Sequence, residues 1–152
     1  MKLQERLFLS YLAWRTRPAI IRRHLQKKRL PERRQVTAAA ADKIRVAAAQ
    51  VEVKLFKDVR AYVDEMARFA LAAARDGAQL LVFPENNNYQ LLGLLPGVDK
   101  LAKEAGSAGG PEQLPVADLF RVVGPIFFRI AAVTFSYLAE RLRLYIVAGS
   151  FP

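Results

Sequence analysis

The sequence predicts an α/β fold built around a short parallel sheet, and three observations support this class. Leu80–Phe83 is a run of four apolar residues between Gly77, which is expected to end the preceding helix, and Pro84. Its length and composition are typical of a parallel strand covered on both faces. A helical apolar stripe at 59–73 precedes it, and an alternating run at 43–50 comes before the stripe. Strand, helix and strand with short links form a βαβ unit.

The alternating run and the stripe each carry a local signal. In Lys43–Gln50 the apolar residues Ile44, Val46 and Ala48 stand at every second position, which is the period of a strand. Asp58 is expected to cap the helix that follows. The apolar residues of that helix recur every three or four positions: Val59, Tyr62, Val63, Met66, Phe69, Ala70 and Ala73. They indicate a helix of about four to five turns with one face buried in a core.

Glu85 is the first residue with functional chemistry beyond the run Leu80–Phe83. Pro84 has no N–H to donate to a sheet ladder, so the strand is expected to end there. In open α/β sheets, ligands and catalytic groups gather just past the carboxyl ends of the strands. A single glutamate after a strand is more often a solvated loop residue. The hypothesis of a catalytic Glu85 therefore depends on the rest of the chain.

The remainder of the chain adds a loop, a helix and a third strand. Residues 97–115 are rich in Gly and Pro and are expected to form a surface loop with one helical turn around Asp99–Ala105. Residues 116–140 are apolar enough to approach a membrane span, but a central Arg129 costs roughly 2.5–3.5 kcal/mol in a bilayer. We therefore expect a helix that is buried in the fold or touches a bilayer surface. Leu144–Gly149 is the third strand.

The basic character of the chain is concentrated in a leader. The net charge is +10; residues 1–35 hold 11 Lys/Arg and 2 Glu, which gives +9, whereas residues 36–152 hold 13 Lys/Arg and 12 Asp/Glu, which gives +1. An amphipathic helix is expected over 3–14, and a second one from Pro18 to about Pro31. Val36–Asp42 resembles a linker.

Three hypotheses are open for this leader. It is a basic amphipathic helix pair on an anionic membrane surface or a partner, a solvated extension, or an arm that binds nucleic acid. Nucleic acid is not the expected partner, because aromatic interleaving is limited to Tyr11 and Trp14. Charges interrupt the apolar stretch, so it is not a secretory signal. We expect a cytoplasmic protein with peripheral contact to the membrane through residues 1–35.

Composition excludes several classes of site. The sequence contains no cysteine, which excludes a disulfide framework, a thiolate zinc site and a cysteine nucleophile within these residues. His24 is the single histidine and lies among arginines and lysines, so it cannot build a multi-histidine metal site and is expected to be part of the basic face. We expect no cofactor and no metal.

Taken in order, the pieces from Lys43 to about Pro152 resemble the amino-terminal half of the nitrilase, or carbon–nitrogen hydrolase, superfamily. The resemblance is carried by Ala49-Gln50 at the end of the first strand, by Gly77-Ala78 leading into 80–85, and by Leu138-Ala139-Glu140 followed by 145–150. It implies half of an αββα sandwich: a βαβ unit with a further helix and strand, preceded by a basic helical leader. Residues 1–42 are then the leader and linker, and 43–152 are a partial carbon–nitrogen hydrolase domain.

The resemblance also implies a Glu-Lys-Cys mechanism acting on small-molecule amides or nitriles. Glu85 matches the glutamate, the general base that takes the proton from the cysteine thiol and later from the hydrolytic water. The lysine would stabilise the oxyanion. Lys100 and Lys103 are the lysines that follow Glu85, neither matches the family position, and the cysteine is absent. Asn88-Tyr89 stands where the family often has Gly-Tyr.

These departures give further expectations. The chain alone is predicted to be inactive. Half of a sandwich would leave an apolar sheet face open, so we expect either a homo-oligomer or a missing C-terminal half. The alternative function is a non-catalytic module, derived from the same fold, that associates with a membrane or a partner. A membrane-bound acyl-transferase relative is a third hypothesis, although the leader offers no clear span.

Overall fold

The order of elements agrees with an α/β chain preceded by two helices. The computed structural model describes residues 3–32, 43–98, 100 and 116–150. Its elements in chain order are α1 (Leu3–Arg15), α2 (Pro18–Lys27), β1 (Val46–Ala48), α3 (Val59–Arg75), β2 (Leu80–Val82), η1 (Asn87–Leu94), α5 (Val116–Leu142) and β3 (Tyr145–Val147). The predicted linker at 36–42 and most of the predicted loop at 97–115 lie outside the described residues.

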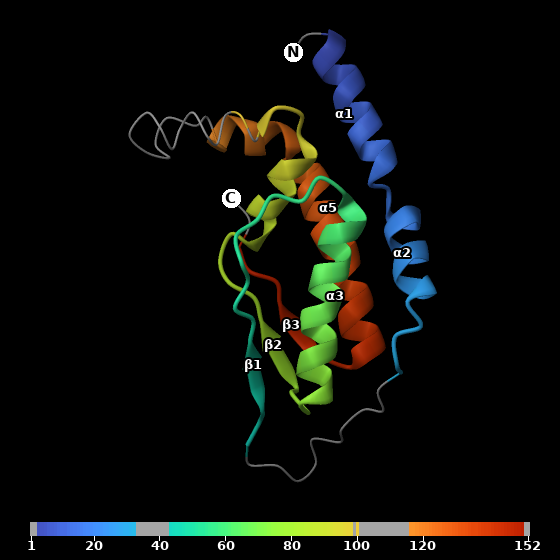
Figure 1. Ribbon diagram of the computed structural model, residues 1–152, viewed down its shortest axis with the longest axis vertical. Helices are drawn as coiled ribbons and strands as arrows, with labels where there is room; N and C mark the ends of the chain where they lie inside the picture. Colours follow the sequence, from blue (N-terminus) through green and yellow to red (C-terminus); the bar gives the residue numbers. More distant parts are fainter. Residues whose placement is uncertain (1–2, 33–42, 99, 101–115, 151–152) are drawn as a thin grey trace.

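The three strands form one parallel sheet in the order β1-β2-β3. Val46 pairs with Leu80, which in turn pairs with Tyr145. Figure 1 shows α3 and α5 side by side against one face of this sheet, with α2 on their outer side and α1 extending beyond the body. The βαβ unit predicted from residues 43–83 is therefore present, and the third strand joins β2 as a parallel neighbour.

Only one face of the sheet is covered by described residues. Leu81, in the middle of the central strand, is fully buried beneath the helices. On the opposite face, Val46 and Val147 are about half exposed and Tyr145 is 79% exposed. Cover on both faces, expected for the strand at 80–83, is therefore wrong for the described chain, whereas the open apolar face agrees with the expectation for half of a sandwich. Alternate side chains of a strand point to opposite faces of the sheet, and no described helix covers the face that carries Val46, Tyr145 and Val147.

Helix α3 begins and ends where local chemistry predicts. The Oδ1 atom of Asp58 accepts a hydrogen bond of 2.6 Å from the Arg60 backbone N–H, as a capping side chain does. Gly77 follows the helix with φ +79°, a left-handed conformation in which glycine has no steric penalty. Of the predicted apolar stripe, all residues are buried except Phe69, which is half-buried.

Helix α5 is one long apolar element that packs inside the fold. Its residues Phe127 and Ile130 are fully buried, and the Arg129 Nη2 donates a hydrogen bond of 3.2 Å to the Ala13 carbonyl of α1. Within the described chain, Asp118–Leu142 is the segment long and apolar enough to cross a membrane. Length and composition alone do not distinguish a span from a core helix, and 44% of its apolar window is buried in the protein.

Helix α2 is packed on the same body. It contacts both α3 and α5, and its Ile21 and Leu25 are fully buried. The hypothesis of a solvated extension is therefore wrong for α2. The helix also ends at Lys27, earlier than the predicted end near Pro31, because Arg29 turns left-handed (φ 48°) and directs Leu30 into the core.

Asp64 joins α2 to α3. Its Oδ1 lies 2.5 Å from the His24 Nε2 and 2.8 Å from the Lys28 Nζ. Partial burial raises the pKa of Asp64, but the hydrogen bonds and charges of Lys28 and His24 outweigh it and hold the pKa below the ordinary value of 3.8. His24, expected only as part of the basic face, also links two helices.

Replacing Asp64 by Asn should lower the melting temperature by a few degrees at neutral pH. The lowered pKa means that the carboxylate stabilises the folded state above pH 3.8 and loses that contribution as pH falls through its folded pKa. With the side chain 42% exposed, solvent screening limits the effect to below about 1 kcal/mol. Thermal melts of wild type, D64N and the control E140Q should show a deficit in D64N alone, vanishing in acid. A deficit that does not shrink as the pH falls below 3.8 would contradict this.

Candidate active site at the carboxyl edge of the sheet

The carboxyl ends of all three strands meet at one edge of the sheet. Beyond β1, the Ala49 N–H donates a hydrogen bond of 2.8 Å to the Val82 carbonyl. Beyond β2, the Phe83 N–H donates a hydrogen bond of 2.8 Å to the Val147 carbonyl. Because the sheet is parallel, the three sequence pieces that carry the family resemblance end beside one another. This is the edge where ligands gather in α/β sheets.

Phe83 anchors the segment that presents Glu85. It is 2% exposed, and its ring centroid lies 6.0 Å from that of Phe69 on α3 and 4.9 Å from that of Phe135 on α5. Glu85, two residues later, is exposed in a turn and forms no hydrogen bond or ion pair with any described residue. The chain therefore passes from core to solvent within two residues, and the carboxylate is open to a molecule bound at this edge.

Gly149 holds the end of β3 against the turn that carries Glu85. Its φ is +86°, and a Cβ at this position would lie 2.3 Å from the Pro84 carbonyl oxygen and 3.6 Å from the Asn87 Cβ. Such an approach to a backbone oxygen leaves no room for any side chain. Glycine is therefore required here on two grounds, conformation and space.

After Glu85 the chain forms a short 3-10 helix with buried amides, which the sequence does not anticipate. Asn86 is left-handed (φ 57°), and Asn87, Asn88 and Gln90 are buried. The Gln90 Nε2 donates a hydrogen bond of 3.0 Å to the Asn87 Oδ1, and the Asn87 Nδ2 lies 3.3 Å from the Met66 sulfur. Within the described residues, neither amide atom of Asn88 has a hydrogen-bond partner. A layer of buried amide side chains thus lies beneath the turn.

Two signals in the sequence point to this layer. Asn tolerates the left-handed conformation found at Asn86, since its short polar side chain bonds locally. Gly93 permits a close approach, because a Cβ there would lie 2.6 Å from the Phe56 carbonyl oxygen. The Phe56 N–H in turn donates a hydrogen bond of 2.9 Å to the Gln90 carbonyl. Asn86 and Gly93 each indicate one backbone position with an unusual conformation or a close contact, but neither identifies the segment that it contacts. Neither residue alone therefore predicts the 3-10 helix.

Tyr62 lies fully buried at the start of α3, near this layer. Its ring stands edge-on to that of Phe56, with 5.8 Å between the centroids. Burial raises the pKa of Tyr62, so its hydroxyl is neutral at physiological pH. It therefore supplies no charge to the edge of the sheet, and Glu85 remains the acid–base candidate there.

The described residues do not complete a catalytic constellation. No group of three or more His, Asp or Glu side chains among them could hold a metal ion. Lys100 is exposed in a helical segment after η1, and Lys103 lies outside the described residues. No family model matches this sequence, and no curated protein or solved structure matches it either.

Proposed function

We propose that this chain supplies the general base of a carbon–nitrogen hydrolase site of the nitrilase type, with Glu85 in that role. One observation carries the proposal: Glu85 is exposed immediately past the carboxyl end of the central parallel strand, where the ends of β1 and β3 also meet. A general base must be within hydrogen-bond reach of the proton that it removes, so it must be held rigidly and remain open. The buried Phe83 and the glycine contact at Pro84 provide the first condition.

The chemistry requires a thiol from outside the 152 residues. The Glu85 carboxylate takes the thiol proton, the sulfur attacks the amide carbon, and the C–N bond breaks as Glu85 passes that proton to the nitrogen, which leaves as ammonia. Water then attacks the acyl–sulfur carbon while Glu85 takes its proton, and the C–S bond breaks to release the acid as Glu85 returns the proton to the sulfur. The open face of the sheet, with Val46, Tyr145 and Val147 exposed, is the surface against which a second layer would bring that thiol.

Ammonia release from small amides and nitriles tests this proposal. The tagged chain should be recovered from its source cells together with any polypeptide that assembles on it, and assayed beside the chain purified alone. We expect activity only in the assembly, and a loss of about 10²–10⁴-fold in E85Q, which removes the base but keeps its shape. E140Q, an exposed glutamate on α5, should retain full activity. An inactive assembly, an active isolated chain or an active E85Q would contradict the proposal.

A second candidate function is attachment to an anionic membrane surface through α1, and a specific observation favours it. Leu3, Leu7, Tyr11 and Trp14 lie at helical spacing on one face of α1, and all four are more than half exposed. The guanidinium of Arg17 lies 5.6 Å from the Trp14 ring centroid. The side of α1 that packs on the body is apolar too and carries the buried Leu12, so the exposed stripe, with an aromatic ring and a basic residue at its end, is apolar surface that a bilayer interface could cover.

Flotation with anionic vesicles tests this attachment. Residues 1–35 cannot simply be deleted, because α2 contributes Ile21 and Leu25 to the core. The double substitution Leu7→Gln and Trp14→Gln removes two of the four residues of the apolar stripe without touching a buried residue, and should shift most of the protein from the vesicle fraction to the soluble one. Val53→Gln, at a position 90% exposed, is the control for loss of exposed apolar surface. Equal flotation of both variants and wild type would exclude α1 as the anchor.

A further inference from the structure

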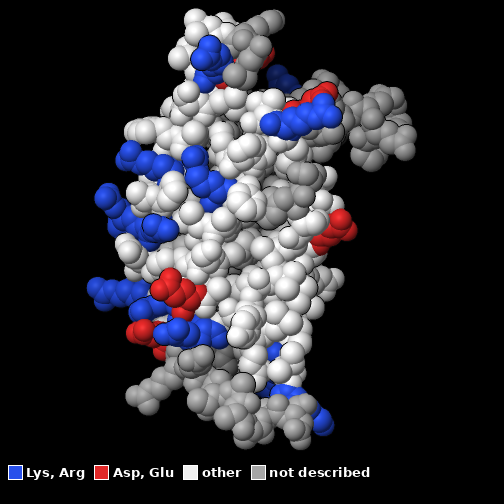
Figure 2. Space-filling view, turned by 180° about the vertical axis from the view of Figure 1, so that it is seen from behind, with Lys and Arg blue, Asp and Glu red and all other residues white. Residues whose placement is uncertain are grey.

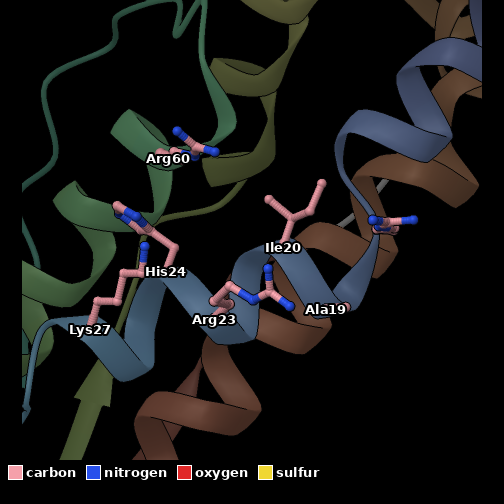
Figure 3. Close-up of a pocket in the computed structure, with 7 residues that line it drawn as sticks. Ala19, Ile20, Arg23, His24, Lys27 and Arg60 are labelled. Carbon is pink, nitrogen blue, oxygen red and sulfur yellow. The ribbon is translucent and has the colours of Figure 1, made fainter.

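A basic pocket lies between α2 and the first turn of α3, away from the edge that carries Glu85. Its volume is about 180 Å³. The lining residues are Arg17, Ala19, Ile20, Arg23, His24, Lys27 and Arg60. Figure 3 shows that Arg60 comes from α3 and faces side chains of α2 across the pocket. Five of the seven are Arg, Lys or His, and none is acidic.

The helical spacing of α2 creates this concentration of charge. Ile20, Arg23 and Lys27 are separated by three and four residues, so their side chains lie on one face of the helix. Figure 2 shows Lys and Arg gathered on the side of the molecule that α2 occupies. The amino end of the helix has no acidic residue in its first turn and no side-chain cap. The helix dipole therefore adds to the positive potential near Arg17.

Apart from His24, which is paired with Asp64, the basic side chains that line the pocket form no ion pair with a described carboxylate. The carboxylate that α3 presents to α2 is that of Asp64, and it is already engaged by His24 and Lys28. The side chains of Arg23, Lys27 and Arg60 form no ion pair with any described acidic residue. Like charges around a small concavity repel one another, and a bound anion would relieve that repulsion.

We propose that this pocket binds a phosphate group. Guanidinium groups from two helices and the Lys27 ammonium group line the pocket together, and these groups bind the oxygens and the double charge of a phosphate monoester. The apolar part of the pocket wall consists of Ala19 and Ile20, and no aromatic ring lines the pocket on which a nucleobase could stack. The pocket is therefore expected to bind the phosphate group and to make no specific contact with a base. A lipid headgroup and a small soluble phosphate compound present the same chemistry. The site is separate from Glu85, and it shares Arg17 with the α1 surface proposed above to contact a membrane.

Binding of two probes to the full chain tests the site. The first probe is inorganic pyrophosphate, titrated by calorimetry and followed by amide NMR shifts at constant ionic strength. The second is a phosphatidylcholine vesicle containing phosphatidic acid, used in flotation. Arg23→Gln and Arg60→Gln each remove one guanidinium from a different wall of the pocket, and each should weaken binding by about tenfold or more. Arg22→Gln is the matched control, since it is exposed on the same helix, does not line the pocket and changes the net charge equally.

The outcomes separate the two sources of phosphate. Pyrophosphate binding that falls in R23Q and R60Q but not in R22Q supports a soluble ligand, and the same pattern in flotation supports a lipid headgroup. Far-UV circular dichroism and melting temperature should match wild type in all three variants, because each side chain is exposed. The proposal would be overturned if neither probe binds, or if R22Q loses as much binding as R23Q, which would indicate a response to net charge alone.

Discussion

Replacing Gly149 by alanine is expected to lower the free energy of unfolding by roughly 3 kcal/mol, with strain and overlap contributing comparable parts. The backbone at Gly149 has φ +86°, which an L residue rarely adopts. The added Cβ would also lie 2.3 Å from the Pro84 carbonyl oxygen, so the end of β3 and the turn before Glu85 would have to separate. Urea unfolding followed by circular dichroism measures the loss.

Gly97 provides the control for this substitution. Its φ is +80°, nearly the same as that of Gly149, but nothing lies within 4 Å of the Cβ that alanine would add. Gly97→Ala should therefore cost only the conformational strain, roughly 1–2 kcal/mol. The difference between the two variants isolates the contact between β3 and Pro84. Equal losses would show that this contact contributes nothing and that only the backbone conformation requires glycine.

The parts of the fold that the sequence predicts are those with local causes. The start of α3 depends on a capping bond between residues two apart, from Arg60 to Asp58, and its end on the conformation of Gly77. The apolar stripe of the same helix needs nothing beyond the 3.6-residue period. Each of these features is decided within one or two turns of chain, so the pattern of residues is sufficient.

The features that the sequence does not predict are decided between distant segments. The apolar composition of the run at 80–83 favours a strand covered on both faces, but the covering layers come from distant parts of the chain, and the described helices cover one face. His24 and Asp64 are 40 residues apart, and nothing near either residue identifies the other as its partner. The basic pocket likewise needs Arg60 to face α2, which follows from helix packing and not from composition.

The position of Glu85 combines both kinds of information. Pro84 predicts where the strand ends, and the structure places Glu85 in an exposed turn just beyond it. What holds that turn is not local: Phe135 on α5, the end of β3 at Gly149 and the buried amides of η1 all converge on it. The sequence therefore identifies the candidate residue, whereas its support depends on the tertiary fold.

Replacing Phe83 by alanine should remove most of that support and cost about 3–5 kcal/mol, the range for a buried phenylalanine whose site cannot collapse. Phe83 is 2% exposed and its ring lies between those of Phe69 and Phe135, so it ties the end of β2 to both covering helices. Domains of this kind are stable by only about 5–15 kcal/mol, so the variant should melt far below wild type. Differential scanning calorimetry measures the shift.

Phe128 offers the same chemical change at a position 57% exposed on α5, and Phe128→Ala should cost much less. The difference in stability between Phe83→Ala and Phe128→Ala measures the effect of burial, because both variants lose the same ring. If the two variants were equally stable, Phe83 would not be the anchor of the edge, and Glu85 would lack the rigid support that a positioned base requires. If Phe83→Ala alone is destabilised, the carboxyl edge of β2 depends on the packing of α3 and α5, and any activity assigned to Glu85 should be lost at temperatures where wild type retains it.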